Sequence, residues 1–355
     1  MLLTPIILFV ILMILLYVPP VQNFIRKQAT AIASDATGMN ISVERIDLRF
    51  PLNLLVRGVQ VVQPGSDTID IQHPDTLLNL GSLNVRVQAW PLLKGRVEVD
   101  DITLQRVAVN SSGLLEGMRI KGTLGRFFLA SHGIDLNKED AVLNRVELSD
   151  THVQVMLADT TETPEDTTET ALNWRVALHN LKLKNVSVDL QMPLDSMSLA
   201  ATIGDASIED AEADLKRQFY GWRKFALTGT SVNYDTGTAV PAEGFDASHI
   251  ALRDIRIGID SVMTCGRDMN AVIREFSMYD RSGLTVTSLT GRLFADSAVI
   301  RVPYLQLKTP HSEMNLTAQT YWKLVDIPTT GQLSARFNAN IGKQDVLLFV
   351  GGLPE

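Results

Sequence analysis

The chain has 355 residues, of which 45% are hydrophobic, and its formal net charge is −8 with an isoelectric point near 5.3. This hydrophobic content excludes global disorder, and the acidic balance argues against a nucleic-acid partner, because nucleic-acid binders carry a concentrated basic face. The single cysteine, Cys265, excludes an internal disulfide framework and a multi-cysteine metal site.

The first twenty residues predict a membrane anchor. Residues 2–18 are almost wholly apolar and are followed by Pro19 and Pro20. As a helix this run would be ~25 Å long, the lower limit for crossing a bilayer core. Its central apolar side chains are Ile6, Ile7, Leu8, Phe9, Ile11, Leu12, Ile14 and Leu15.

A cleaved signal peptide is the alternative interpretation of this segment. Small-x-small sites occur at residues 29–31 and 31–33, but they lie well beyond the apolar run, and no Lys or Arg precedes it. We therefore expect an uncleaved single span over residues 1–20. Arg26 and Lys27, the nearest basic residues, follow the span and favour a cytoplasmic body. Large domains cross regardless of charge, so charge does not decide the orientation.

Residues 21–40 predict an amphipathic helix that ends near Gly38. Val21, Phe24, Ile25 and Ile32 are spaced for one helical face, with alanines between them. Such a helix could lie on the membrane surface or cap the end of a β-domain, and the second use is the more common.

From residue 41 onward the apolar pattern has the period of two that is typical of β-strands. Two alternating apolar residues are followed by a polar pair, and the unit repeats over residues 97–109, 176–188, 41–48 and 250–259. The polar pairs are Asp100-Asp101, Gln105-Arg106, His179-Asn180, Lys184-Asn185, Glu44-Arg45 and Arg253-Asp254.

In a regular strand, residues three apart point to opposite faces, so each polar pair would turn the next apolar residues outward. A β-bulge at each pair would keep the apolar residues on one face. A solenoid corner at each pair is the alternative, but each run stops after about three units, too few to stack a solenoid core.

We predict a mainly β fold: an elongated, strongly curled antiparallel sheet with bulged strands and one apolar groove. Its candidate lining residues are Val97, Val99, Ile102, Leu104, Val107, Val109, Val176, Leu178, Leu181, Leu183, Val186, Val188, Ile255 and Ile257.

The rest of the chain predicts further strands of one domain over residues 41–355. Strands are expected at residues 83–89, 146–157, 199–203, 225–234, 284–293, 299–307, 314–322 and 333–341. Residues 206–219 fit either a helical stripe or the strand pattern, and we favour a strand. Residues 158–170 are acidic, rich in threonine and without apolar clusters, which predicts a solvated loop leaving one sheet rather than a domain boundary.

No motif predicts an enzyme, a metal site or a cofactor. The glycines of residues 117–125 lack the Lys-Ser/Thr of a phosphate-binding loop, and the six histidines are scattered singly. Asp100-Asp101 could suggest a metal site, but other polar pairs fill its place in the repeat, so a polar bulge is the better interpretation.

Several features of the chain together resemble the start of the AsmA/TamB family. They are an N-terminal anchor, a short helix ending near Gly38, and the segment VERIDLRFPLNLLVRGVQV followed by LNVRVQAWPLLKGRVEVDDITLQRVAV. The later segments IALRDIRIGIDSVM, SGLTVTSLTGRL and LQLKTPHSEMNL are similar to TamB-like translocation and assembly module proteins. Members of that family are typically much longer, and nothing in this chain corresponds to their C-terminal domain.

The resemblance implies a single-pass protein of the bacterial inner membrane with its β-domain in the periplasm. It implies a role in phospholipid transport between the two membranes, in outer-membrane protein assembly, or in both. Phospholipid is then the cargo and an outer-membrane assembly barrel protein a partner. The alternative is a structural β-solenoid or sandwich stalk whose apolar face is closed on itself and carries no lipid.

Overall fold

The computed structural model describes residues 27, 28, 31, 34, 37–49, 52–62, 76–88, 99–111, 117–135, 138–157, 173–237, 240–326 and 332–350. Sixteen strands and two labelled helices make up most of this part of the chain. The elements are β1 (Asn40–Arg49), β2 (Asn53–Val62), β3 (Thr76–Val87), β4 (Val99–Asn110), β5 (Met118–Asp135), β6 (Asp140–Leu157), β7 (Arg175–Met192), β8 (Met197–Asp214), β9 (Phe219–Thr236), β10 (His249–Cys265), β11 (Asp268–Asp280), β12 (Thr285–Val286), β13 (Ser288–Ala295), β14 (Val299–Lys308), β15 (Glu313–Tyr321), α4 (Trp322–Asp326), β16 (Leu333–Asn340) and α5 (Lys343–Val350).

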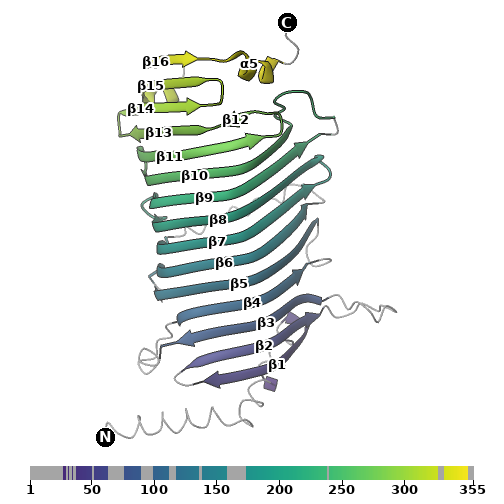
Figure 1. Ribbon diagram of the computed structural model, residues 1–355. Helices are drawn as coiled ribbons and strands as arrows, with labels where there is room; N and C mark the ends of the chain where they lie inside the picture. Colours follow the sequence, from purple (N-terminus) through teal and green to yellow (C-terminus); the bar gives the residue numbers. More distant parts are fainter. Residues whose placement is uncertain are drawn as a thin grey trace, which may run out of the picture.

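All sixteen strands belong to one sheet, and they lie in it in the order of the sequence from β1 to β16 (Figure 1). Only the short β12 leaves this path, because it pairs with β11 beside β13. At roughly 4.8 Å between neighbouring strands, the sheet extends about 70 Å across its strands. The long strands β5 to β9 have 18 residues each, well above the usual length of a strand in a globular protein.

The neighbouring strands are antiparallel with one exception, the parallel pair β6 and β7. The segment between these two strands contains the predicted acidic loop, residues 158–170, which lies outside the described residues. The two strands that flank it are nevertheless direct neighbours, paired from Asp140 with Arg175 to Met156 with Gln191. The strands on both sides of this segment therefore belong to one sheet.

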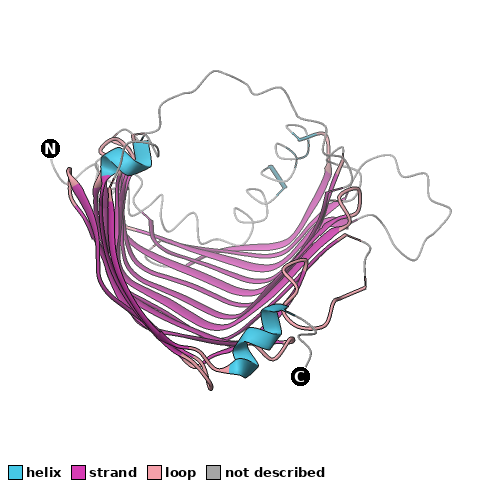
Figure 2. Cartoon of the chain, turned by 90° about the horizontal axis from the view of Figure 1, so that it is seen from above, coloured by secondary structure: helices cyan, strands magenta, loops and turns pink. Residues whose placement is uncertain are grey.

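The prediction of a strongly curled sheet is wrong. The sheet is one open layer whose first and last strands lie at opposite ends of the molecule (Figure 1), and seen from above its strands bend so that one face is concave (Figure 2). Strong curling was expected from a bulge at each polar pair, but the register is the same on both sides of most of these pairs, as described below.

The layer is single among the residues that the structure describes. Strands pack against their neighbours in the sheet, α4 lies against β15, and α5 lies against the loop that precedes β10. No large side chain of the described residues is fully buried, and the closely buried apolar side chains are few. A closed solenoid or a two-layer sandwich, the alternative raised by the sequence, is not the architecture of this part of the chain.

The helix predicted over residues 21–40 is described only at its end. Residues 27, 28, 31, 34 and 37 are helical, and the backbone N–H of Gly38 donates a hydrogen bond of 2.9 Å to the carbonyl of Ser34. Gly38 has φ of +67°, the left-handed conformation that ends many helices and favours glycine. The predicted helix end is therefore confirmed.

No helix within the described ranges is long and apolar enough to cross a membrane. The predicted anchor, residues 1–20, and its eight central side chains lie outside the described residues.

Most strands expected from the sequence are present, including the ambiguous segment 206–219. That segment is the second half of β8 and a turn, followed by the start of β9. No strand was expected at β2, β5 or β11, and the two short helices α4 and α5 were not expected either. In β5, Gly122, Gly125 and Gly133 interrupt the alternation of apolar residues, which removes the period-two signal.

Candidate functional site

The candidate lining residues of β4, β7 and β10 lie in common rows across the sheet. The register runs from Leu104 through Phe127, Leu148, Leu183, Ala206 and Leu227 to Ile257. A second row runs from Ile102 through Leu129, Val146, Leu181, Ile208 and Phe225 to Ile259. Residues in one row lie on the same face, so these strands contribute to continuous apolar bands.

Two further apolar rows run parallel to these. One contains Leu80, Val107, Leu124, Thr151 and Val186, and it reaches Ile255 through Thr230. The other contains Leu78, Val109, Gly122, Val153, Val188 and Ala201, and continues to Val232 and Leu252. Of the remaining candidates, Val99 pairs with Val87, and Val176 and Leu178 extend β7 toward its start. Val97 lies outside the described residues.

The structure adds row members that sequence analysis did not name. They come from β5, β6, β8 and β9, and include Phe127, Leu129, Val146, Leu148, Ile208, Phe225 and Leu227. Their strands also contain glycine, alanine and charged residues, so their periodicity is weaker than that of β4 and β7. Only the register shows that they share rows with the predicted residues.

A line of register positions, which we call the kink row, separates the rows of Ile102 and Leu104 from the rows of Val107 and Val109. It consists of Glu44 in β1, Gly58 in β2, Gly81 in β3, Arg106 in β4, Gly125 in β5, Asp150 in β6, Asn185 in β7, Gly204 in β8, Gly229 in β9 and Asp254 in β10. From β1 to β9 these residues face one another across neighbouring strands without being regular ladder partners. In β10 the register shifts, so Asp254 lies opposite Ser231 and not opposite Gly229.

Left-handed backbone recurs along the kink row. Residue φ angles are +60° at Gly58, +53° at Arg106, +52° at Asp150, Asn185 and Asp254, and +61° at Gly229. Non-glycine residues rarely adopt this conformation outside turns, and Asn and Asp tolerate it best. This preference explains why polar residues recur at these positions within otherwise apolar strands.

The glycines of the kink row make room for their neighbours. A Cβ atom added to Gly81 would lie 3.0 Å from the Cβ of Arg106, and one added to Gly125 would lie 2.7 Å from the Cβ of Asp150. A Cβ atom on Gly204 would lie 2.7 Å from the carbonyl oxygen of Gly229. The strands therefore approach so closely here that one member of each of these pairs must lack a side chain.

Exposure shows what the kink row does to the two faces. Gln105 and Arg106 are both exposed while Leu104 and Val107 on either side are half-buried, and Lys184-Asn185 and Arg253-Asp254 repeat this pattern. Two consecutive exposed residues are expected where the alternation of faces is reset. The apolar residues on both sides of each pair therefore share the more shielded face.

The predicted bulges occur in an altered form. A bulge would place an extra residue in one strand, yet the register is the same on both sides of Arg106, where Gln105 pairs with Arg126 and Val107 with Leu124. The left-handed Arg106 and the opposite Gly125 both stand outside the ladder pairing, so neither strand contains an extra residue. Register shifts do occur beside Asp100, between Arg86 and Val87, and in β10 around Asp254.

The row of Val107, which lies next to the kink row, is the most shielded, and the row of Val109 beyond it is the outer row. Leu80 is 8% exposed, Val186 6% and Ile255 5%, whereas Val109 and Val188 in the outer row are each 39% exposed. The apolar face thus remains accessible along its outer row in the part of the chain that the structure describes.

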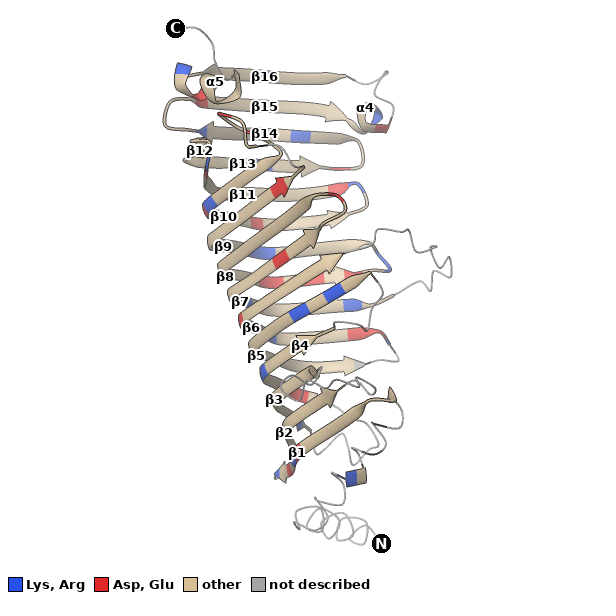
Figure 3. Ribbon diagram, turned by 90° about the vertical axis from the view of Figure 1, so that its right-hand side faces the viewer, with Lys and Arg blue, Asp and Glu red and all other residues tan. Residues whose placement is uncertain are grey.

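Charged residues of both signs are interspersed over many strands of the sheet (Figure 3). Asp100 and Asp101, which could suggest a metal site, have structural partners there. The side-chain amide of Gln88 donates a 2.7 Å hydrogen bond to Asp100, and Arg86 forms a 3.1 Å ion pair with Asp101. Within the described ranges, no group of three or more His, Cys, Asp or Glu side chains is placed to hold a metal ion.

A second irregular position lies further along the same strands. Asp210 in β8 has φ of +49° and Ser261 in β10 has φ of +53°, and Arg223 of β9 lies between them in the register. Arg223 forms ion pairs with Asp210, at 2.7 Å, and with Glu209. Hydrogen bonds from Arg223 and His179 lower the pKa of the Asp210 carboxyl. These exposed contacts join β7, β8 and β9 where their backbones are irregular.

The site is therefore a set of apolar rows on both sides of the kink row, and the described residues place no cluster of metal-binding side chains in it. Comparison with protein-family models and with curated proteins finds no family and no relative that matches this chain.

Proposed function

We propose that the chain is a membrane-anchored lipid conduit of the bacterial envelope, whose apolar face carries lipid tails between membranes. The observation that supports this best is the continuity of the apolar rows over β4 to β10 without a described element covering them. Exposed apolar surfaces of this extent normally mark a binding surface for protein, membrane or ligand.

Under this proposal the apolar rows line the concave side of the sheet (Figure 2). Side chains on a concave face converge and shield one another, while those on a convex face spread apart. The half-buried state of Leu104 and Val107 against the exposure of Gln105 and Arg106 agrees with that assignment. Such a face offers a lipid tail apolar contact along its whole length while the headgroup stays in water.

The physical role of the surface is to lower the barrier for a lipid that leaves a bilayer. Each methylene kept from water contributes ~0.8 kcal/mol, so a tail moving along the apolar rows avoids most of the cost of crossing water. No step of this process needs an acid, a base or a metal. A role in assembly of outer-membrane proteins uses the same surface for apolar strands of a client protein.

Charged substitutions on the apolar rows test the proposal. Leu104→Glu and Leu181→Glu should leave the protein folded, because each carboxylate can reach solvent on an open face, but should reduce co-purified phospholipid severalfold. Ser207→Glu is the matched control, because it adds the same charge next to Ile208 on the opposite face. Phospholipid per mole of protein is measured by mass spectrometry, and folding by circular dichroism and chemical denaturation.

The structural stalk predicts a different outcome. If the apolar face is covered in the complete protein, either glutamate buries an unpaired charge at a cost of several kcal/mol, enough to unfold a marginal domain. Loss of folding in both variants, or wild-type protein without bound lipid, would reject the conduit.

A further inference from the structure

The polar face of β1 to β6 has an excess of positive charge that pairing does not remove. Three carboxylates on this face are each matched by an arginine: Asp47 with Arg45 at 2.6 Å, Asp101 with Arg86 at 3.1 Å, and Glu147 with Arg145 at 3.6 Å. In each of these pairs the two opposite charges neutralise each other.

Several arginines on the same strands have no carboxylate partner among the described residues, and three of them lie on the polar face. The side chains of Arg49, Arg57 and Arg126 form no ion pair or hydrogen bond with any residue that the structure describes. Arg126 instead places its guanidinium over the ring of Phe128, 5.7 Å from the ring centroid. The guanidinium groups of Arg49 and Arg126 are therefore available to a ligand.

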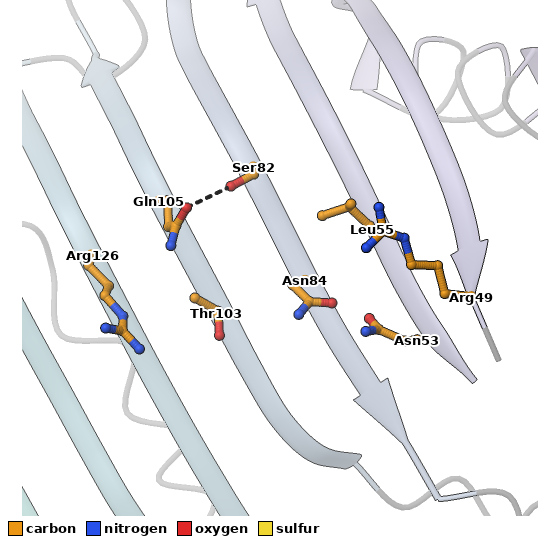
Figure 4. Close-up of a pocket in the computed structure, with 8 residues that line it drawn as sticks. All are labelled: Arg49, Asn53, Leu55, Ser82, Asn84, Thr103, Gln105 and Arg126. Atoms are coloured by element: carbon orange, nitrogen blue, oxygen red, sulfur yellow. Dashed lines mark hydrogen bonds between the residues drawn. The ribbon is translucent and has the colours of Figure 1, made fainter. Parts of the chain in front are cut away.

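A hollow of about 340 Å³ lies between Arg49 and Arg126. Figure 4 shows Arg49 on β1 and Arg126 on β5 at its two ends, with Asn53, Asn84 and Thr103 between them. No acidic residue lines it. Asn84 and Thr103 alternate with Val85 and Ile102 along their strands, so the hollow is on the face opposite the apolar rows.

Two acceptors inside the hollow lack a donor. The side-chain oxygens Oδ1 of Asn53 and Asn84 are buried, and neither accepts a hydrogen bond. A buried acceptor without a partner is costly, so such atoms normally bind water or a ligand. The hollow thus combines cationic ends with a floor that requires a hydrogen-bond donor.

We propose that this hollow binds a phosphate ester that carries an ammonium or hydroxyl group. The phosphate pairs with the guanidinium group of Arg126, and charge-assisted bidentate hydrogen bonds are the favoured geometry of such a pair. The ammonium or hydroxyl donates to Asn53 and Asn84. A headgroup-sized molecule fills the available volume, whereas lipid tails would have no apolar contact on this face.

The ligand chemistry has two sources, a phospholipid headgroup at a membrane surface or a free phosphate ester. Full-length protein in a nonionic detergent is titrated by calorimetry with glycerophosphoethanolamine, glycerol 3-phosphate and inorganic phosphate. Both esters should bind more tightly than inorganic phosphate, because only they donate to the two asparagines. A separate binding assay with phosphatidylethanolamine vesicles tests the membrane source, and phosphatidylcholine vesicles are its control, since choline lacks a donor.

Variants locate the binding. Arg126→Gln should weaken ester binding about tenfold, the loss expected for one charge-assisted pair. Arg49→Gln, at the other end of the hollow, should weaken it less. Asn84→Leu should abolish the preference for the esters over inorganic phosphate. Arg256→Gln removes an exposed arginine on β10 and should leave binding unchanged.

The results separate this proposal from the lipid conduit. Ester binding that depends on Arg126 supports the site, and the same dependence with phosphatidylethanolamine vesicles identifies the lipid headgroup as the source. Absence of ester binding, or equal effects of Arg126→Gln and Arg256→Gln, overturns the site. Neither result changes the expected lipid content of the apolar-face variants.

Discussion

At the scale of single residues, backbone conformation explains the unusual composition of these strands. Polar residues at Arg106, Asp150, Asn185 and Asp254 look out of place in apolar strands, yet all have left-handed φ angles. They reset the alternation of faces, so the apolar residues on both sides remain together. A polar pair inside a strand is therefore part of the device that keeps the apolar face continuous.

Gly204→Ala tests the close approach of strands at the kink row. The added Cβ would lie 2.7 Å from the Gly229 carbonyl oxygen and 3.0 Å from that of Thr228, so the backbones must separate. We expect a loss of about 1–3 kcal/mol in the free energy of unfolding, measured by urea denaturation.

Gly133→Ala is the control for this substitution. A Cβ atom at Gly133 meets nothing within 4 Å, so the variant should be as stable as the original protein or slightly more stable. Equal stability of the two variants would contradict the close packing inferred for the kink row.

At the scale of elements, one aspartate organises the loop that holds α5. The carboxylate of Asp246 accepts hydrogen bonds from the backbone N–H groups of Ala242, at 3.0 Å, and Ser248, at 2.9 Å. The same loop receives α5, where the N–H of Phe245 donates to the Leu348 carbonyl at 2.7 Å. The ring of Phe245 lies 5.5 Å from that of Phe349.

Acidification should release this loop. The hydrogen bonds from Ala242 and Ser248, with that of His249, lower the pKa of Asp246 from its ordinary value of 3.8 to about 2. Because the folded pKa is depressed, its stabilising effect is complete above 3.8 and is lost as the pH falls toward about 2. NMR titration of the carboxyl carbon and the Ala242 amide measures the midpoint, and Asp246→Asn should abolish the transition. A midpoint near 3.8 would contradict the hydrogen-bonded loop.

At the scale of the whole molecule, strands are added in sequence order to one layer, so each strand depends mainly on two neighbours. This arrangement resembles a repeat protein more than a globular domain, because stability comes from nearest-neighbour interfaces. It also extends the apolar rows with each added strand. The length of the surface is then set by the number of strands.

The predicted anchor over residues 1–20 would hold this surface at a membrane. Full-length protein expressed in bacteria should remain in the membrane pellet after alkaline extraction, and a variant lacking residues 1–20 should be released. The physical reason is the uncharged apolar run of residues 2–18. N-terminal sequencing of the mature protein that begins near Ser34 would indicate cleavage and contradict the anchor.

The sequence by itself determined the class of the fold, most strand positions and the helix end at Gly38. It also predicted that the apolar side chains within segment 102–109 share one face although a polar pair interrupts the segment, and likewise within segment 181–188. These properties depend on residues close together in the chain, whose side-chain period and local turn preferences are visible in one segment.

Only the tertiary structure decided which residues stand side by side. The kink row, the parallel pairing of β6 with β7 and the hollow between Arg49 and Arg126 all depend on register between strands. Pairing joins residues that are distant in sequence, and no local period records the partner or the offset. For the same reason the degree of curling was mispredicted, because a bulge is defined by the register between two strands, and that register is unchanged on both sides of most polar pairs.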